Sequence, residues 1–98
     1  MEKKLMMVMT KDEMGRIKFN GRLITVDLHG LTSRMAERLI KNIMALDREG
    51  YDICAIHGYS HGTAIKEMIS GRLQGSRLKG KDPVKRNPGR TILRMQAA

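Results

Sequence analysis

The sequence has a single cysteine, two prolines and no long apolar run. One cysteine excludes an internal disulfide and a zinc site of the CxxC type. Cys54 stands in the apolar run Ile53-Cys54-Ala55-Ile56, where we expect a small buried side chain. No apolar run approaches the ~20 residues that cross a bilayer, and the apolar stretch near Met1 is too short for a signal peptide. We therefore expect a cytoplasmic protein with no membrane partner.

Acidic residues are also scarce, because ten Asp and Glu face nineteen Lys and Arg, giving a net charge of +9. The excess is concentrated in residues 66–98, which hold nine basic and two acidic residues. A basic surface at one end of a protein indicates a polyanionic partner, and nucleic acid fits better than a membrane because no broad apolar helix face accompanies the charges. The basic residues that we predict to hold a nucleic-acid backbone are Arg77, Lys79, Lys81, Lys85, Arg86 and Arg90.

What the sequence does contain is a strand–helix–strand pattern. Residues 23–28 predict a buried strand, and residues 51–56 predict a second one, whose continuous apolar core is typical of a parallel sheet. Between them, apolar side chains spaced by three and four predict a helix that Thr32 or Ser33 caps and Gly50 ends. A right-handed βαβ crossover then brings the carboxyl ends of both strands to one edge of the sheet.

The rest of the chain predicts a second helix and closing strands. We expect a helix over residues 63–74, a short strand near Leu78 within a mostly irregular segment 76–90, and a last strand over residues 91–95. The length fits one domain. The predicted fold class is α/β: a two-layer βαβα sandwich with a closing pair of β-strands.

Residues 1–22 form an extension ahead of this pattern. Their clearest signal is Asn20-Gly21 between two apolar runs, which is typical of a two-residue hairpin turn. Two interpretations stay open: the extension adds an edge hairpin to the sheet, or it forms a mobile basic arm. The sequence therefore divides into an N-terminal extension, residues 1–22, and a main domain, residues 23–98.

Two loops at the shared sheet edge carry all three histidines of the chain. Val26-Asp27-Leu28-His29-Gly30 follows the first strand, and His57-Gly58-Tyr59-Ser60-His61-Gly62 follows the second. Imidazole titrates near neutral pH and serves as an acid, a base or a metal ligand. Gly58 and Gly62 bracket a turn that opens a helix, where backbone amides could cradle a phosphate. Tyr59 could stack on a base.

Asp27 is the only carboxylate in either loop, whereas two-metal phosphodiester cleavage usually needs several. The residues therefore favour cleavage with a histidine as the base, with Asp27 orienting it or His57 serving as the acid. RNA suits such a site because its 2′-hydroxyl is an internal nucleophile. A metal site with Asp27, His29 and His57 as ligands stays open, so a divalent metal ion is not excluded as a cofactor.

The two loops resemble the paired motifs of Smr (small MutS-related) domains. Residues 26–30 are similar to the LDLHG motif, and residues 57–62 are similar to HGxGxG, with Ser60 in place of the middle glycine. The resemblance implies a fold like the C-terminal domain of translation initiation factor 3, and nucleic-acid binding, often with endonuclease activity. It also implies that Asp27 and His29 take part in cleavage. The second motif is tied to binding, and its residues here are His57, Gly58, Tyr59, Ser60, His61 and Gly62.

The sequence therefore predicts an endonuclease that cleaves RNA or nicks DNA, with Asp27 and His29 at the cleavage centre. The alternative is a non-catalytic module that recognises structured or branched DNA or RNA, and the basic segment fits both hypotheses. A third hypothesis is an interaction domain whose basic face has no nucleic-acid partner. The sequence does not predict the oligomeric state, for which a monomer is one option.

Overall fold

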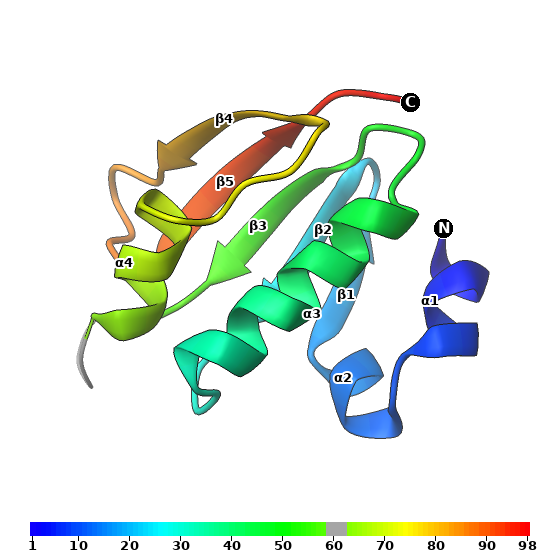
Figure 1. Ribbon diagram of the computed structural model, residues 1–98, viewed down its shortest axis with the longest axis horizontal. Coiled ribbons are helices and arrows are strands. Elements are labelled where there is room, and N and C mark those ends of the chain that lie inside the picture. The colour runs from blue at the N-terminus through cyan, green and yellow to red at the C-terminus, as the bar shows by residue number, and fades with distance from the viewer. Residues whose placement is uncertain (59–62) are drawn as a thin grey trace.

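The computed structural model describes residues 1–58 and 63–98, and these residues form a mixed five-stranded β-sheet with helices (Figure 1). The strand order is β1-β2-β3-β5-β4. The strands are β1 (Ile17–Asn20), β2 (Leu23–Asp27), β3 (Asp52–Ile56), β4 (Leu78–Pro83) and β5 (Arg90–Met95). The helices in the same part of the chain are α1 (Glu2–Val8), α2 (Lys11–Gly15), α3 (Ser33–Leu46) and α4 (Ala64–Ser70).

The predicted strand–helix–strand unit is present as β2, α3 and β3. Strands β2 and β3 are parallel, with Asp27 opposite Ile56, so their carboxyl ends lie side by side. The side chain of Thr32 accepts a hydrogen bond from the backbone amide of Met35 and caps α3, as predicted. The helix ends at Leu46, earlier than the Gly50 stop that we expected. The unit confirms that both loops begin at the same edge of the sheet.

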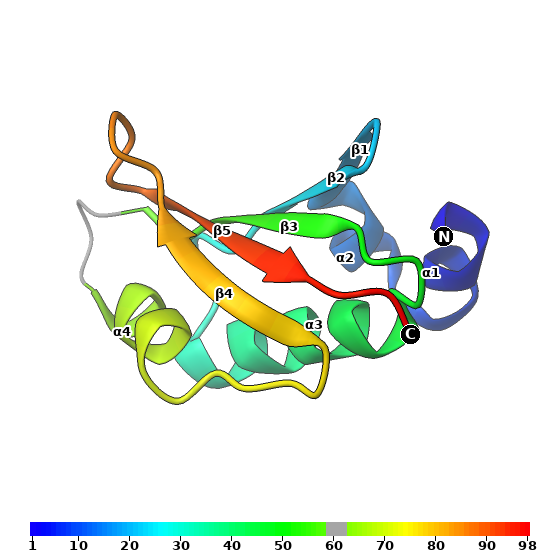
Figure 2. The same ribbon diagram turned by 90° about the horizontal axis from the view of Figure 1, so that it is seen from above.

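The molecule has two layers, a sheet and the helices that cover one of its faces. Figure 2 shows α3 and α4 together on the same side of the sheet. The buried face of α3 packs onto alternating apolar residues of the central strands. The helix residues of this core are Ala36, Leu39, Ile40, Ile43 and Met44, and the strand residues include Ile24, Val26, Ile53, Ala55 and Leu93. The α/β sandwich predicted from the sequence is therefore confirmed.

The C-terminal half differs from expectation in two places. Helix α4 ends at Ser70, not at residue 74, and Gly71 closes it by donating its amide to the carbonyl of Glu67. A Cβ atom at Gly71 would lie 2.9 Å from that carbonyl oxygen, so a larger residue would not fit this turn. Strand β4 is longer than the short strand expected near Leu78, and it pairs antiparallel with β5 at the edge of the sheet. Pro83 is tolerated there because an edge strand has an unpaired side.

The N-terminal extension is folded onto the rest of the molecule. Strand β1 forms an antiparallel hairpin with β2, with Ile17 opposite Val26. Helices α1 and α2, which the sequence did not predict, precede it, and Leu5 of α1 is completely buried in the core. Thr10 and Glu13 form a reciprocal capping box at the start of α2. Within the described residues, no helix is both long enough and apolar enough to cross a membrane.

Candidate functional site

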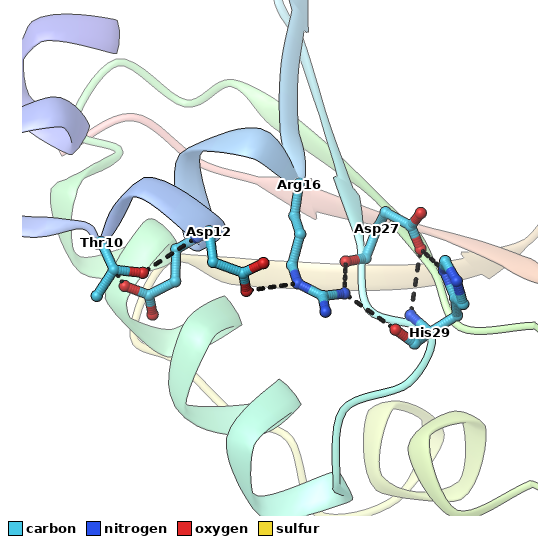
Figure 3. A network of polar contacts seen from close by, with 6 residues as sticks. Thr10, Asp12, Arg16, Asp27 and His29 are labelled. Carbon is cyan, nitrogen blue, oxygen red and sulfur yellow. Dashed lines mark hydrogen bonds and ion pairs between the residues drawn. The ribbon is translucent and has the colours of Figure 1, made fainter.

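The strongest feature of the sheet edge is a carboxylate–imidazole contact at the end of β2. Oδ1 of Asp27 lies 2.6 Å from Nδ1 of His29, and the same oxygen accepts a hydrogen bond of 3.1 Å from the backbone amide of His29 (Figure 3). Gly30 follows with a φ of +83°, which turns the chain away from the strand toward α3. The side chain of His29 is 74% exposed and that of Asp27 is 38% exposed. The Asp27–His29 pair is therefore open to a ligand.

The electrostatics of the pair fix which ring nitrogen carries the proton. Partial burial raises the pKa of Asp27, but hydrogen bonds from His29 and the charges of His29 and Arg16 outweigh it, so the pKa is lowered overall. The ionised carboxylate accepts hydrogen bonds only, so Nδ1 of His29 donates. When the ring is neutral, Nε2 is then the nitrogen without a proton. The ring that carries it is exposed to solvent. An imidazole oriented in this way by a carboxylate can accept a proton at Nε2.

The side chain of Arg16 forms hydrogen bonds with the backbone of the same loop. Its Nη1 donates to the carbonyl of Asp27 at 3.1 Å and to the carbonyl of His29 at 2.9 Å, while its Nε donates to Oδ2 of Asp12 at 3.2 Å (Figure 3). The backbone amide of Asp27 donates to the carbonyl of Arg16 at 2.8 Å. Sequence reasoning missed this residue. The hairpin turn consists of Gly21 and Arg22, one residue later than predicted, and that shift sets Arg16 opposite Asp27.

His57 has a different environment from His29. Only 6% of its surface is exposed, its Nδ1 lies 2.8 Å from the carbonyl of Gly58, and its Nε2 lies 3.0 Å from Oγ1 of Thr91. A carbonyl only accepts, so Nδ1 is the donor and Nε2 accepts from the threonine hydroxyl. Both ring nitrogens are therefore occupied within the fold. The structure does not bring the His57 ring to the Asp27–His29 pair as a free acid or ligand.

The remainder of the second loop begins at Gly58. This residue has a φ of +72°, and its amide donates to the carbonyl of Gly89 at 3.1 Å. The amide of His57 donates to the same carbonyl at 2.8 Å, so the second loop is bonded to the connection between β4 and β5. The other predicted binding residues of this loop, Tyr59, Ser60, His61 and Gly62, lie outside the described residues.

Three of the six predicted basic residues lie at the end of the sheet where β2 and β3 stop, which is also the end that carries the Asp27–His29 pair. Lys85 and Arg86 are exposed in the connection between β4 and β5, which Figure 2 shows at the end of the sheet where β3 ends. Arg90 is opposite Ile56, which in turn is opposite Asp27. With strands about 4.8 Å apart, the backbones of Arg90 and Asp27 are about 10 Å apart. We call Lys85, Arg86 and Arg90 the basic turn.

The other three basic residues are placed elsewhere. Arg77 donates from Nη2 to the carbonyls of Met44 and Ala45 at 2.9 and 3.2 Å, and so caps the last turn of α3. Lys79 is exposed at the far end of β4, since its neighbour Leu78 pairs with the end of β5. The ammonium of Lys81 is 3.5 Å from the carbonyl of Gly71, on the helix side of the sheet. The structure thus separates the predicted basic segment into two groups.

The described residues contain no group of three or more His, Cys, Asp or Glu side chains that could hold a metal ion. The nearest approach to the metal site considered from the sequence is the Asp27–His29 pair alone, because the ring nitrogens of His57 are bonded to Gly58 and Thr91.

Comparison with known proteins adds no assignment. No protein-family model matches the chain, and a search of curated proteins gives no significant match.

Proposed function

We propose that this protein binds nucleic acid at the carboxyl edge of β2 and β3 and cleaves its phosphodiester backbone, with His29 as the general base. The observation that carries the proposal is the 2.6 Å contact between Asp27 and the Nδ1 of an exposed imidazole. The resemblance of residues 26–30 to the LDLHG motif of Smr domains supports the same residues, and the net charge of +9 supports a polyanionic substrate.

The geometry favours RNA as the substrate. Nε2 of His29 takes the proton from a 2′-hydroxyl, the 2′-oxygen forms a bond to phosphorus, and the bond from phosphorus to the 5′-oxygen breaks. Water protonates the leaving 5′-oxygen, and the hydroxide that remains takes the proton from the imidazolium of His29, so the products are a 2′,3′-cyclic phosphate and a 5′-hydroxyl and the base is regenerated. The carboxylate of Asp27 stabilises the imidazolium that forms on His29, as an orienting acid does in other histidine-based sites. DNA lacks this internal nucleophile.

The basic turn supplies the backbone contacts. Arg90 shares the sheet face of Asp27 across one intervening residue, Ile56, so a phosphate bound by its guanidinium lies close to the exposed ring of His29. Lys85 and Arg86 extend the positive charge beyond the sheet edge. Contacts of this type provide affinity without reading base sequence.

The test is a cleavage assay on four substrates: single-stranded RNA, double-stranded RNA, linear DNA and branched DNA. Wild type and His29→Ala are compared, with and without EDTA. We expect RNA cleavage that persists in EDTA and leaves a 2′,3′-cyclic phosphate, and we expect His29→Ala to abolish cleavage while binding is retained. Cleavage that depends strictly on a divalent metal would contradict the proposed role of His29, and cleavage confined to DNA would contradict the RNA assignment.

The second candidate is a non-catalytic module that binds structured or branched nucleic acid. The burial of His57 favours it, because that ring has no free nitrogen to serve as the acid partner of His29. Wild type that binds RNA or branched DNA but cleaves none of the four substrates would support this module. Binding that does not weaken as salt rises would contradict both candidates, since phosphate contacts release counterions.

A further inference from the structure

The N-terminal extension reaches the candidate site through one side chain. We propose that Arg16 is a positioning residue for the Asp27–His29 pair, so that residues 10–16 are part of the site and not an appendage to it. The inference rests on the proposed function for its effect on cleavage, but the contact that it describes is independent of any substrate.

The guanidinium of Arg16 bridges two points of the first loop. Its Nη1 donates to the carbonyl of Asp27 at 3.1 Å and to the carbonyl of His29 at 2.9 Å, on either side of Leu28. Fixing both carbonyls fixes the two peptide planes from which the side chains of Asp27 and His29 project. The 2.6 Å contact between those side chains depends on that backbone geometry. Arg16 therefore acts on the pair without touching its reacting atoms.

Arg16 is itself held in place from two directions. Its carbonyl accepts the amide of Asp27 at 2.8 Å, which continues the β1–β2 hairpin, and its Nε bonds to Oδ2 of Asp12 at 3.2 Å. The side chain is only 22% exposed, so few alternative rotamers are open to it. Helix α2, which carries Asp12, is closed at its start by the capping box of Thr10 and Glu13. A series of contacts thus runs from α2 to the loop.

A lysine could not replace this side chain. The fork of the guanidinium donates in several fixed directions at once, whereas an ammonium is a point charge on a flexible stem. Lysine at position 16 would keep the positive charge near Asp27 but would not bridge the carbonyls and Asp12 together. The pair of variants Arg16→Ala and Arg16→Lys therefore separates charge from geometry.

The experiment measures single-turnover cleavage and substrate affinity for wild type, Arg16→Ala, Arg16→Lys and the control Lys11→Ala. Lys11 is an exposed residue of α2, the helix that carries Asp12, so its substitution removes one positive charge, as Arg16→Ala does, without reaching the loop. We expect Arg16→Ala to slow cleavage on the order of 10- to 100-fold, with the dissociation constant unchanged. We expect Arg16→Lys to recover only part of the rate and Lys11→Ala to match wild type.

Chemical rescue measures whether added guanidinium restores the cleavage rate, which it would not do if Arg16 only stabilised the fold. Guanidinium chloride, added at low concentration against matched sodium chloride, should restore part of the rate of Arg16→Ala and none of the rate of His29→Ala. A rate for Arg16→Ala equal to that of Lys11→Ala would overturn the proposal, and so would full activity of Arg16→Lys.

Nuclear magnetic resonance separates this proposal from the proposed function. If wild type cleaves no substrate, the proposed function fails, and the imidazole signals of His29 and the amide exchange of residues 28–30 still test Arg16. We then expect Arg16→Ala to speed amide exchange there and to change the His29 ring signals, with Lys11→Ala unchanged. Signals identical to wild type in Arg16→Ala would overturn the positioning role by themselves.

Discussion

The two strand-end loops begin alike and end in different environments. Each has a His-Gly step just beyond a parallel strand, with His29 two residues after the end of β2 and His57 one residue after the end of β3, and Gly30 and Gly58 adopt similar positive φ angles of +83° and +72°. The side chain of His29 is nevertheless 74% exposed, whereas His57 is buried with both ring nitrogens bonded. The same short motif therefore provides an exposed imidazole beyond one strand and a buried, hydrogen-bonded imidazole beyond the next.

The neighbouring strands explain the difference. Strand β3 lies beside β5, and the start of β5 brings Thr91 and the preceding Gly89 against the second loop. Strand β2 lies beside β1, and the residue that precedes β1, Arg16, contacts the first loop through its carbonyls and leaves the ring of His29 uncovered. The exposure of each imidazole thus depends on what packs beside each strand and on its position beyond the strand end, because His57 corresponds in register to the buried Leu28 and His29 lies one residue further along.

Apart from the loss of His29 itself, the largest expected effect on cleavage comes from removing the charge that orients His29. Asp27→Asn should lower the cleavage rate by about 10²–10⁴-fold, because a neutral amide does not stabilise the imidazolium and its NH2 group can donate to Nδ1, which places the ring proton on Nε2. Single-turnover kinetics measures this loss, and a rate within twofold of wild type would show that the carboxylate is not part of the mechanism.

The same variant has a defined effect on stability. Because the pKa of Asp27 is lowered in the folded state from its usual 3.8, its charge contributes stability that is fully present above that value and is lost as the pH falls through the lowered pKa. The free energy of unfolding of Asp27→Asn should therefore be lower than that of wild type at neutral pH, and this difference should shrink as the pH falls. A difference that grows in acid would contradict the assigned direction.

The second prediction concerns the buried histidine. His57→Ala should lower the free energy of unfolding by roughly 2–4 kcal/mol, because it leaves a cavity and removes the partners of Thr91 and Gly58. Urea denaturation measures this loss, with His29→Ala as the matched control, which should lose less stability because removal of its exposed ring leaves no buried cavity. Equal stability losses in the two variants would remove the distinction between the loops.

Sequence patterns predicted the parts of this site that depend on neighbouring residues in the chain. The apolar periodicity indicated β2, α3 and β3, and the strand ends indicated the position of Asp27 and His29. The roles of His57 and Arg16 depend instead on distant partners, Thr91 at 34 positions away and the carbonyls of the first loop. No local pattern encodes those interactions. With the turn predicted one residue too early, the sequence did not place Arg16 opposite Asp27.

The third prediction separates the two groups of basic residues. Replacing Lys85, Arg86 and Arg90 together by alanine should lower RNA affinity and reduce the slope of log affinity against log salt by about one for each phosphate that the variant no longer binds. Lys79→Ala, at the far end of β4, is the matched control and should change neither. A slope that falls equally in both variants would show that the nucleic acid covers the whole sheet and not only the edge that carries the Asp27–His29 pair.

The smallest expected effect is the loss of stability when alanine replaces the glycine with a positive φ in each loop. Among residues 1–58 and 63–98, no atom beyond the chain neighbours lies within 4 Å of a Cβ added at Gly30 or Gly58, so with respect to these residues an alanine meets only the strain of a positive φ. That strain costs about 1–2 kcal/mol, and we expect Gly30→Ala and Gly58→Ala to reduce stability equally in urea denaturation. Equal reductions would mean that the positive φ costs the same in both loops and that the position and partners of each imidazole make the loops different. A much larger reduction in Gly58→Ala would instead trace the difference to the amides that His57 and Gly58 donate to Gly89.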